Sequence, residues 1–427
     1  MVYHSLPSRP PGVWVFVMLE LVETIVIGGG QAGLALSYHL AKSGREHVVL
    51  ERGRVAERWR SERWDSLHFQ FPNWMIRLPG RVYDGDDPDG FSKRDDIVRF
   101  ISDYAARNAA PLRCGVSVNG LNRNESGRLV VSAGSMSMAA ANVVVATGPY
   151  QLPTLPSCAA HLPASVRQVT ASRYTRPSDL PPGNVLVVGS GASGFQIVED
   201  LLRQGRRVYY SLRGHRRVPR RYRGRDIGRW NEEMGLTNRT VDVLQSGFRP
   251  PLVTGYDGGA TVDLRDVAER GVTLLGSLQH VERMRVFFAT DLNANLVTGD
   301  ETFRQAVSAI DAHIASNGID APPAGELSDL MAKQPKSLPE IDMIDLNAAA
   351  ITTVIWAVGY SHDFGWINCD VLDARGRPIQ RRGVTAVPGV YFLGLPRMHK
   401  VQSAFLWGVG EDAEFLSQHI KGRRVVS

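Results

Sequence analysis

A glycine-rich turn near the start of the chain has the residue types and spacing of a loop that binds a dinucleotide. Gly28, Gly30 and Gly33 follow an apolar run in a G-x-G-x-x-G pattern. In such a loop the first glycine permits a tight turn, the second lets the backbone approach a pyrophosphate, and the third lets the helix pack closely on the strand. Glu51 ends the next apolar run, where its carboxylate can accept hydrogen bonds from ribose hydroxyls. We therefore predict that residues 23–53 form a first dinucleotide cradle.

A second turn repeats this pattern with a different charge at its end. Gly189, Gly191 and Gly194 have the same spacing as the first three glycines. The run that follows ends in Ser211 and Arg213 and carries no acid. A hydroxyl and a guanidinium suit a 2′-phosphate, which a carboxylate would repel. The second cradle is therefore predicted to bind NADPH rather than NADH. A degenerate copy that binds nothing is the alternative.

The two cradles, residues 23–53 and 184–217, together imply two cofactors. The helix after each turn offers free N–H groups and the positive end of its dipole to phosphates. A nicotinamide donor paired with a second, tightly held dinucleotide most simply means NADPH and FAD. The redox chemistry then belongs to the cofactors, and the protein aligns and shields them.

Apolar runs and helical patterns around the cradles supply the elements that position them. Short β-branched runs stopped by glycine are typical of buried parallel strands. Such strands are predicted at 22–27, 47–51, 142–150, 352–360 and 389–396. Helices are predicted at 31–42, 92–109, 300–318 and 403–420. The run at 352–360 echoes the one at 142–150, which suggests equivalent strands in two similar units.

These elements predict an α/β fold with two doubly wound, Rossmann-type dinucleotide-binding domains. A chain of 427 residues exceeds one typical core, so two domains are expected. Residues 18–152 and 341–427 are predicted to form a discontinuous FAD-binding domain. Residues 153–340 are predicted to form the NADPH-binding domain inserted within it.

Two segments of the chain are less informative. Residues 1–17 are interpreted as an extension without stable structure, and the natural start is either Met1 or Met18. The segment 231–340 contains few motifs, and we expect the substrate pocket to draw on it.

Composition excludes several other classes of protein. Hydrophobic residues make up 43% and charged residues 22% of the chain, as in an ordinary soluble enzyme. No apolar run approaches the roughly 20 residues that a membrane span needs. The three cysteines form no C-x-x-C pair, which argues against a zinc site or a redox dithiol and suits the cytoplasm. The acidic run at 83–90 is typical of a surface turn, so no metal is expected.

Positive charge is concentrated after the second cradle. Eleven arginines and a single acid, Asp226, lie between Arg203 and Arg229. A basic run can bind nucleic acid, but one or two of these arginines suit a phosphorylated cofactor. We expect the others to pair with acids or to face water. No nucleic-acid partner is predicted, and a homodimer is compatible with the sequence.

The order of motifs resembles the class B flavin-dependent monooxygenases, which include flavin-containing monooxygenases, Baeyer–Villiger enzymes and the YUCCA enzymes. The matching motifs are "VIGGGQAG", "VVVATG", "VLVVGSGASG", "VIWAVGY" and "GVYFLGLP", and the similarity is closest to a bacterial branch of flavoproteins. The resemblance implies that FAD binds the first cradle and NADPH the second. It also implies that reduced FAD reacts with O2 at its C4a carbon, and that the resulting peroxyflavin oxygenates a small organic substrate.

The family's cofactor-binding positions can be transferred to matching residues. The resemblance implies FAD contacts at Gly28, Gly30, Gln31, Ala32, Gly33, Glu51, Arg52, Trp59, Arg60, Trp64, Gly394 and Ser403. It also implies cofactor-binding positions at Thr147, Gly148 and Gly359, in the linker turns between the domains. It implies NADPH contacts at Gly189, Ser190, Gly191, Ala192, Ser193, Gly194, Ser211 and Arg213. The closing helix is expected to direct its N-terminus, near Ser403, at the flavin.

The chain departs from the family where catalysis is concerned. In the family's F-x-G-x-x-x-H-x-x-x-Y/F signature, Ala164, Val166 and Thr170 replace the first three residues, and only Tyr174 is retained. Gln70 stands where many members have asparagine, and its amide can still donate a hydrogen bond. Gln70 is thus the catalytic candidate, but a reductase or oxidase that releases peroxide and a non-catalytic flavoprotein remain alternatives.

Other side chains near the first cradle have less specific interpretations. His68 is interpreted as a structural hydrogen-bonding residue rather than an acid or base. Trp74, Met75 and Trp407 belong either to a substrate pocket or to the core.

Overall fold

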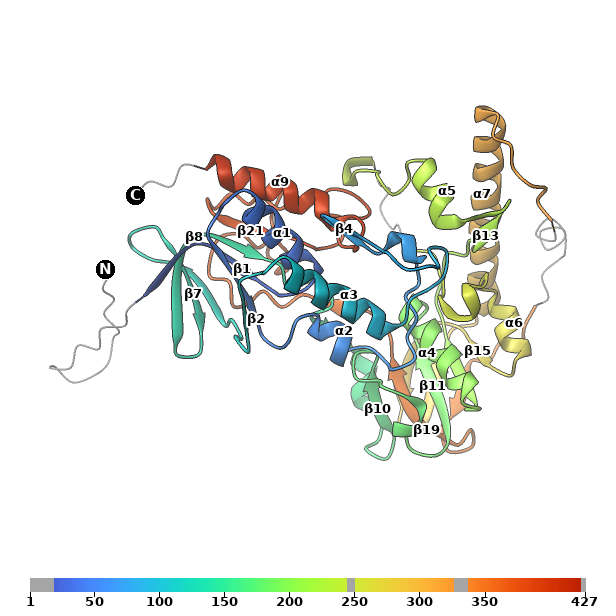
Figure 1. Ribbon diagram of the computed structural model, residues 1–427. Helices are drawn as coiled ribbons and strands as arrows, with labels where there is room; N and C mark the ends of the chain where they lie inside the picture. The colour runs from blue at the N-terminus through green and yellow to red at the C-terminus, as the bar shows by residue number, and fades with distance from the viewer. Residues whose placement is uncertain (1–18, 244–249, 326–336, 424–427) are drawn as a thin grey trace.

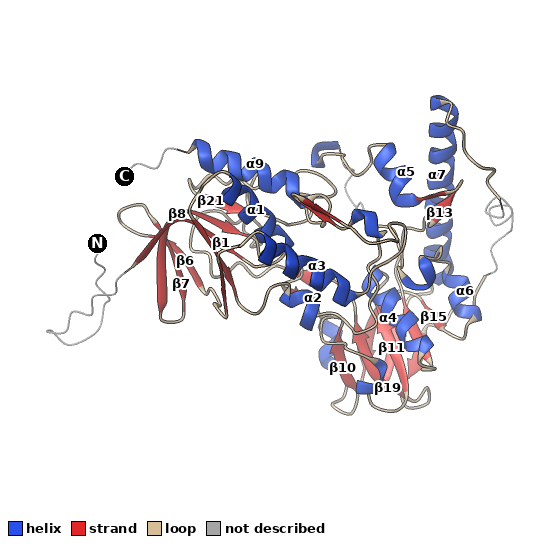
Figure 2. Cartoon of the chain, viewed as in Figure 1, coloured by secondary structure: helices blue, strands red, loops and turns tan. Residues whose placement is uncertain are grey.

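Two sheets with parallel strands, each covered by helices, form the frame of the protein (Figures 1 and 2). The computed structural model describes residues 19–243, 250–325 and 337–423. The predicted extension at 1–17 lies outside the described residues. The two sheets confirm the α/β class with two doubly wound units.

The first sheet has the strand order β5-β2-β1-β8-β7-β6, and β21 also pairs with β8. Its strands are β1 (Glu20–Ile27), β2 (His47–Glu51), β5 (Leu112–Cys114), β6 (Gly120–Arg123), β7 (Leu129–Ala133), β8 (Met136–Val145) and β21 (Val390–Phe392). Val26 shares a buried cluster with residues of the helices α1 (Gln31–Lys42) and α9 (Val409–Gly422), whereas Ile25 and Ile27 belong to a cluster on the other face. Both faces are buried, as the continuous apolar run predicts.

The second sheet repeats this arrangement with the order β10-β19-β11-β12-β15. Its strands are β10 (Arg167–Thr170), β11 (Asn184–Val188), β12 (Val208–Ser211), β15 (Thr273–Leu275) and β19 (Ile351–Trp356), and all their pairings are parallel. The helix α4 (Ala192–Arg203) follows β11 as α1 follows β1. The strand β19 lies beside β11 as β8 lies beside β1. This equivalence accounts for the echo between the two apolar runs.

The chain crosses between the two units at one short antiparallel pair. The strand β9 (Leu152–Pro153) leads out of the first unit and pairs with β20 (Tyr360–Ser361), which leads back. The first crossing, at β9, lies at the proposed boundary at 152. The return crossing was placed too early at 341, because β19 forms the second sheet with β11 and β10.

A helical region joins the second sheet and contributes one side of the molecule. It contains the hairpin β13 (Arg221–Tyr222) and β14 (Arg225–Asp226) and the helices α5 (Ile227–Glu233), α6 (Leu264–Glu269) and α7 (Leu292–Asn317). Figure 1 shows α7 beside α5 and above the second sheet. The helix α7 begins at Leu292, earlier than the predicted start at residue 300. Gly299 and Asp300 therefore lie inside the helix, where they are buried against His215 and Arg217 respectively.

The remaining elements are short or cover the sheets. They are the helices α2 (Glu57–Ser61) and α3 (Arg94–Arg107), the hairpin β3 (Arg77–Leu78) and β4 (Arg81–Val82), and the antiparallel strands β16 (Leu278–Glu282), β17 (Arg285–Phe288) and β18 (Met343–Asp345). Within the described ranges, no helix has both the length and the apolar character needed to cross a membrane.

Candidate functional site

The first cradle forms a tight turn between β1 and α1, and two of its glycines are required by close backbone contacts. Gly28 has a φ of +120°, and a Cβ there would lie 2.5 Å from the carbonyl oxygen of Ala146. A Cβ on Gly33 would lie 2.0 Å from the carbonyl oxygen of Gly28. At Gly30, by contrast, a Cβ would meet no atom within 4 Å. The turn therefore leaves open space beside Gly30, at the N-terminus of α1.

The second cradle has the same construction. Gly189 has a φ of +131°, and a Cβ there would lie 2.2 Å from the carbonyl oxygen of Ala357. A Cβ on Gly194 would lie 2.1 Å from the carbonyl oxygen of Gly189, while Gly191 faces open space. Both turns are thus closed against a neighbouring strand and open at the middle glycine, where a phosphate can approach the helix N-terminus.

The carboxylate of Glu51 is held at the end of β2 by two backbone amides. Its Oε2 accepts the N–H of Gly29 at 2.7 Å, and its Oε1 accepts the N–H of Gly53 at 2.9 Å. Each oxygen keeps a further lone pair for a hydroxyl group. The side chain is therefore fixed in a position from which it can bind a ribose.

The corresponding position in the second cradle is not the one that the sequence suggested. The N–H of Gly28 donates to the carbonyl of Leu50, and the N–H of Gly189 donates to the carbonyl of Ser211. Ser211 is therefore the counterpart of Leu50. The counterpart of Glu51 is the next residue, Leu212.

Ser211 and Leu212 are both buried. Ser211 is 1% exposed, and its hydroxyl donates to the carbonyl of Gly276 at 2.8 Å. Leu212 is also 1% exposed and belongs to the core beside α4. The prediction that Ser211 faces a 2′-phosphate is wrong, because the strand directs its side chain away from the cavity. An apolar residue, rather than a hydroxyl, replaces the acid of the first cradle.

Positive charge reaches the second cradle from a residue that the sequence analysis did not select. Arg213 is exposed and is not part of the cavity wall, whereas Gly214, His215 and Arg216 are. Burial lowers the pKa of Arg216 and lowers that of His215 to about 4. His215 is therefore neutral, and Arg216 is the cation that the cavity wall contains here.

One continuous cavity of about 820 Å³ joins the two cradles. The predicted site residues in its wall are Gly28, Gly30, Gln31, Ala32, Glu51, Arg52, Trp59, Gln70, Thr147, Gly148, Ser190, Gly191, Ala192 and Gly394. The predicted site residues outside its wall are Gly33, Arg60, Trp64, Gly189, Ser193, Gly194, Ser211, Arg213, Gly359 and Ser403. Gly33, Gly189 and Gly194 lie on the side of the turns that packs against backbone carbonyls, and not on the side that faces the cavity. The cavity thus brings both nucleotide cradles to one space.

Arg60 and Trp64 do not reach this space, in contrast to the expectation for FAD neighbours. Arg60 donates to the carbonyl of Val55 at 3.0 Å and to the Ser102 hydroxyl at 2.9 Å. Trp64 is 1% exposed and belongs to the core of the second unit. Their sequence neighbours Arg58 and Arg63 line the cavity instead. A short helix and the bend after it determine which of these side chains reach the cavity, and the residue types did not predict either element.

The closing helix begins later than predicted. Its first residue is Val409, and the chain before it runs through turns. Ser403 is 1% exposed, and its hydroxyl accepts the N–H groups of His399 at 3.2 Å and Lys400 at 3.0 Å. Ser403 therefore stabilises the turn. The neighbouring carbonyl of Ala404 accepts the side-chain amide of Gln31 at 2.7 Å, which ties this turn to the first cradle.

Aromatic rings form one wall of the cavity. Phe405 and Trp407 stack with their planes 1° apart and their centroids 4.5 Å apart. Phe71 meets Trp407 edge-on at 4.5 Å, and Phe69 meets Phe71 at 5.5 Å. All four residues line the cavity, so Trp407 belongs to the pocket rather than to a closed core.

Gln70 lies in the same wall, between Phe69 and Phe71. The buried guanidinium of Arg220 donates to its backbone carbonyl at 2.8 Å and is itself paired with Asp226 at 2.8 Å. No described residue forms a hydrogen bond to the side-chain amide of Gln70. The backbone is therefore anchored, and the amide is available to a ligand.

His68 forms a hydrogen bond of the kind that the sequence predicted. Its Nδ1 lies 2.9 Å from the carbonyl of Ser66, and burial lowers its pKa. The ring lines the cavity and packs on Tyr256 with centroids 4.8 Å apart.

Several contributors to the cavity wall were missed by the sequence analysis. Residues 116–118 follow the carboxyl end of β5. Residues 250–253 belong to the segment 231–340, which contains few motifs. Ligands of open α/β sheets bind outside the carboxyl ends of strands, so residues 116–118 could have been found from that rule. Residues 250–253 carry no comparable pattern.

Several arginines of the basic window between Arg203 and Arg229 pair with acids, as expected. Arg203 pairs with Asp257, Arg217 with Asp263 and Asp300, and Arg223 with Asp311. Among the described residues, no cluster of side chains has the composition of a metal site. The three cysteines, Cys114, Cys158 and Cys369, are free.

Comparisons with known proteins agree with this architecture. A family model described as pyridine nucleotide-disulphide oxidoreductase matches residues 25–226. The CzcO-like oxidoreductase of Geobacillus kaustophilus is 33% identical over 408 residues, which cover 94% of this chain and 99% of that protein. The indole-3-pyruvate monooxygenase YUCCA8 of Oryza sativa subsp. indica is 28% identical over 200 residues, which cover 44% of this chain and 47% of that protein. The flavin-containing monooxygenase from Stenotrophomonas maltophilia shares the fold, with a TM-score of 0.65 and 18% identity over 94% of this chain and 99% of that chain.

Proposed function

Because the chain belongs to the CzcO-like oxidoreductase family within the class B flavin monooxygenase group, we propose that it is an NADPH- and FAD-dependent monooxygenase. The proposed reaction takes two electrons from NADPH, consumes O2 and a proton, inserts one oxygen atom into a small organic substrate and releases the other as water. The observation that carries the proposal is the continuous cavity, whose wall includes the open glycine of each cradle.

The first cradle fits FAD. The open space beside Gly30 and the N-terminus of α1 suits a pyrophosphate, and the Glu51 carboxylate suits a ribose. Gln31, Thr147 and the aromatic wall would complete the binding surface. When bound, FAD supplies the redox chemistry of the reaction by accepting a hydride and reacting with O2.

The second cradle fits NADPH. Gly191 and the N-terminus of α4 offer the same phosphate site, and Leu212 removes the carboxylate that would repel a 2′-phosphate. Arg216 in the cavity wall and Arg213 beside it supply positive charge. His68 and Gln196 also line the cavity, and the Gln196 amide donates to the carbonyl of His68 at 3.2 Å.

In the proposed reaction, the protein itself binds and orients the cofactors and the substrate and shields them from solvent. The rings of Phe69, Phe71, Phe405 and Trp407 give the cavity an apolar wall. Gln70 presents an unengaged amide there, which can donate a hydrogen bond to an oxygen atom. The exposed, free thiol of Cys114 suits a reducing compartment, and we place the reaction in the cytoplasm.

Anaerobic reduction followed by oxygen tests the proposal. The purified protein should carry flavin, lose its yellow colour when NADPH is added without oxygen, and oxygenate a substrate when oxygen is admitted. Failure of NADPH to reduce the flavin would contradict the proposed electron donor, and absence of flavin would contradict the whole proposal.

A reductase or oxidase that releases peroxide is the second candidate. The altered signature favours this candidate. Thr170, which replaces the histidine of the signature, has its hydroxyl oxygen 3.1 Å from that of Ser172 and is not part of the cavity wall. Peroxide equal to the NADPH consumed, over a broad panel of substrates, would support this candidate instead.

A further inference from the structure

One face of the helix α4 is polar although it is buried. Gln196, Glu199 and Asp200 are 3%, 6% and 4% exposed, and Arg203 lies one turn further on. Residues at this spacing share one side of a helix. A buried polar stripe of this kind requires partners for each side chain, and those partners show what α4 is fastened to.

The partners come from three segments of the chain outside α4, namely residues 66–68, residues 254–256 and Tyr174. The Gln196 amide donates to the carbonyl of His68 at 3.2 Å, and the Thr254 hydroxyl donates to Glu199 at 2.6 Å. Arg203 lies over the ring of Tyr256 at 4.6 Å. The helix that opens the second cradle is thus joined to the segment that continues into Phe69 and Gln70.

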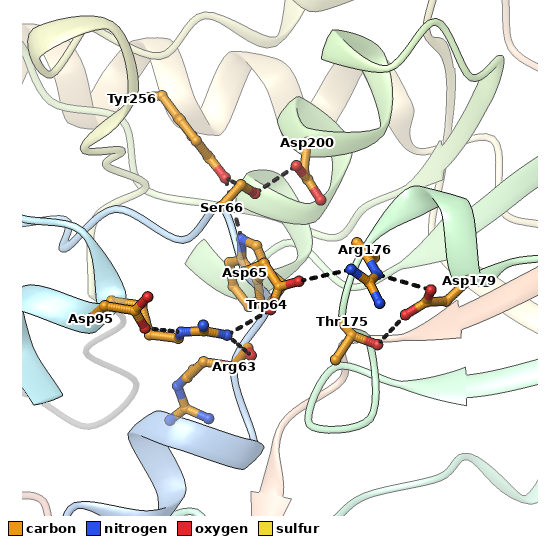
Figure 3. Close-up of polar contacts among 11 residues, drawn as sticks. Arg63, Trp64, Asp65, Ser66, Asp95, Thr175, Arg176, Asp179, Asp200 and Tyr256 are labelled. Carbon is orange, nitrogen blue, oxygen red and sulfur yellow. Dashed lines mark hydrogen bonds and ion pairs between the residues drawn. The ribbon is translucent and has the colours of Figure 1, made fainter.

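Asp200 is the centre of these contacts. Its Oδ1 accepts the Ser66 hydroxyl at 2.5 Å, and its Oδ2 accepts the Tyr174 hydroxyl at 2.6 Å. Tyr174 is the one residue of the family signature that this chain retains. Figure 3 shows Ser66 between Asp200 and Tyr256.

The hydrogens of this network have a single consistent order. Because Ser66 has one hydrogen and gives it to Asp200, Tyr256 donates to Ser66, with the two hydroxyl oxygens 2.8 Å apart. Tyr256 in turn accepts the indole N–H of Trp64 at 3.3 Å. Burial raises the pKa of Tyr256 to about 12, so it keeps its proton. Every donor is used, and both oxygens of the Asp200 carboxylate are required as acceptors.

We propose that Asp200 is a positioning residue that fixes the second cradle relative to the part of the cavity wall formed by residues 67–70, which follow Ser66. The proposal rests on the proposed function, in which the nicotinamide bound at the second cradle must meet the flavin bound at the first. Transfer between two bound rings depends steeply on their separation and orientation. Asp200 acts through α4 and Ser66 and is not part of the cavity wall itself.

The test compares variants that change the network without changing the cavity wall. Asp200→Asn keeps the shape but loses one acceptor, Ser66→Ala removes the hydroxyl, and Ser66→Thr keeps it. Asp179→Asn is the control, because Asp179 also accepts two hydrogen bonds, from Thr175 and Arg176, but lies on an exposed turn. The measurements are the rate constant of flavin reduction at saturating NADPH without oxygen, the Kd of NADP+, the flavin content, and the melting temperature of the flavin-free protein.

Asp200→Asn and Ser66→Ala should each slow flavin reduction roughly tenfold or more, with flavin content and the Kd of NADP+ little changed. Ser66→Thr should restore the rate, and Asp179→Asn should leave it unchanged. In the flavin-free protein, the double variant of Ser66→Ala and Asp200→Asn should lower the melting temperature by less than the sum of the single variants.

Three results would overturn the proposal: normal reduction rates in both variants, equal losses in Ser66→Ala and Ser66→Thr, or additive melting temperatures. If Asp200→Asn does not fold, the comparison between the two Ser66 variants still decides. If NADPH fails to reduce the wild-type protein, the proposed function fails, whereas the melting temperatures still test the contact between Ser66 and Asp200.

Discussion

Leu212 occupies in the second cradle the place that Glu51 occupies in the first. The backbone hydrogen bonds of the two glycine turns define this correspondence. Glu51 is anchored by two amides as an acceptor, whereas Leu212 is part of the core. We therefore propose that selection between the two cofactors rests on the loss of a carboxylate and on the cations that follow in the loop.

The loop after β12 should determine the preference for NADPH over NADH. We expect Arg216→Ala to lower kcat/KM for NADPH roughly tenfold to a hundredfold, because charged hydrogen bonds to phosphate contribute about 1.5–3 kcal/mol. The value for NADH should change little. Arg213→Ala should act in the same direction but less, since Arg213 lies outside the cavity wall.

Arg207→Ala is the matched control for this experiment. Arg207 belongs to the same basic window but stacks over Tyr209 at 5.7 Å. A uniform decrease for both cofactors in Arg216→Ala would contradict a role in phosphate recognition.

Substitution of the middle glycine in each cradle should impair the binding of one cofactor and leave the other bound. Gly30 and Gly191 both have φ values near −90°, which alanine adopts readily, and a methyl group at either would enter open space. Gly30→Ala should therefore fold but contain little flavin. Gly191→Ala should keep its flavin and show a KM for NADPH raised roughly tenfold.

Flavin absorbance and steady-state kinetics measure these two effects. Gly422→Ala is the control, because Gly422 lies near the end of α9 and a Cβ there also meets open space. Loss of flavin in Gly191→Ala would show that the two cradles do not divide their ligands as proposed.

Glu199 should make the stability of the protein depend on pH. Burial raises its pKa to about 7 from 4.5, against the opposing effects of Thr254 and Arg203. The folded state therefore binds the proton more tightly than the unfolded state. The stabilisation is complete below about pH 4.5, decreases as the pH rises, and is lost above about pH 7, a change of roughly 3 kcal/mol at most.

Glu199→Gln should flatten this dependence and raise the melting temperature at pH 8 relative to the wild type. Melting temperatures between pH 5 and pH 8 provide the measurement, with exposed Glu125→Gln as control. A wild-type slope that persists in Glu199→Gln would assign the pH dependence to another group.

Gln70 should affect the fate of oxygen more than the uptake of electrons. In Gln70→Leu the flavin should be reduced at nearly the wild-type rate, but more peroxide should be released for each NADPH consumed, because the unengaged amide is lost. Gln70→Asn keeps an amide and should fall between the two. Product and peroxide assays under identical conditions measure the ratio, and an unchanged ratio in Gln70→Leu would remove Gln70 from the catalytic step.

The local pattern of the chain predicted most of the frame. The glycine turns, the strands on either side of them and the helices α1 and α4 follow from residues within a few positions of one another. The echo between 142–150 and 352–360 predicted equivalent strands, and β8 and β19 have equivalent places. The return crossing was misplaced because the pairing of β19 with β10 and β11 is a long-range contact.

Side-chain direction near the cradles could not be predicted in the same way. Ser211 and Leu212 are adjacent, and a shift of one residue along a strand turns a side chain from one face to the other. Arg60 has the same residue type as Arg58 and Arg63, but a short helix and a bend direct only the latter two into the cavity wall. Residue types do not encode these directions, because they depend on the packing of the whole unit.

The sequence by itself determined that the chain builds two glycine-rich turns between a strand and a helix, and that only the first cradle ends in an acid. Those properties are local, since a G-x-G-x-x-G turn needs only a strand before it and a helix after it. The tertiary structure decided that both turns open into one cavity, that Leu212 takes the place of the acid, and that Asp200 joins α4 to Ser66. These features bring together residues that are far apart in the chain, and their geometry exists only after the two sheets have packed.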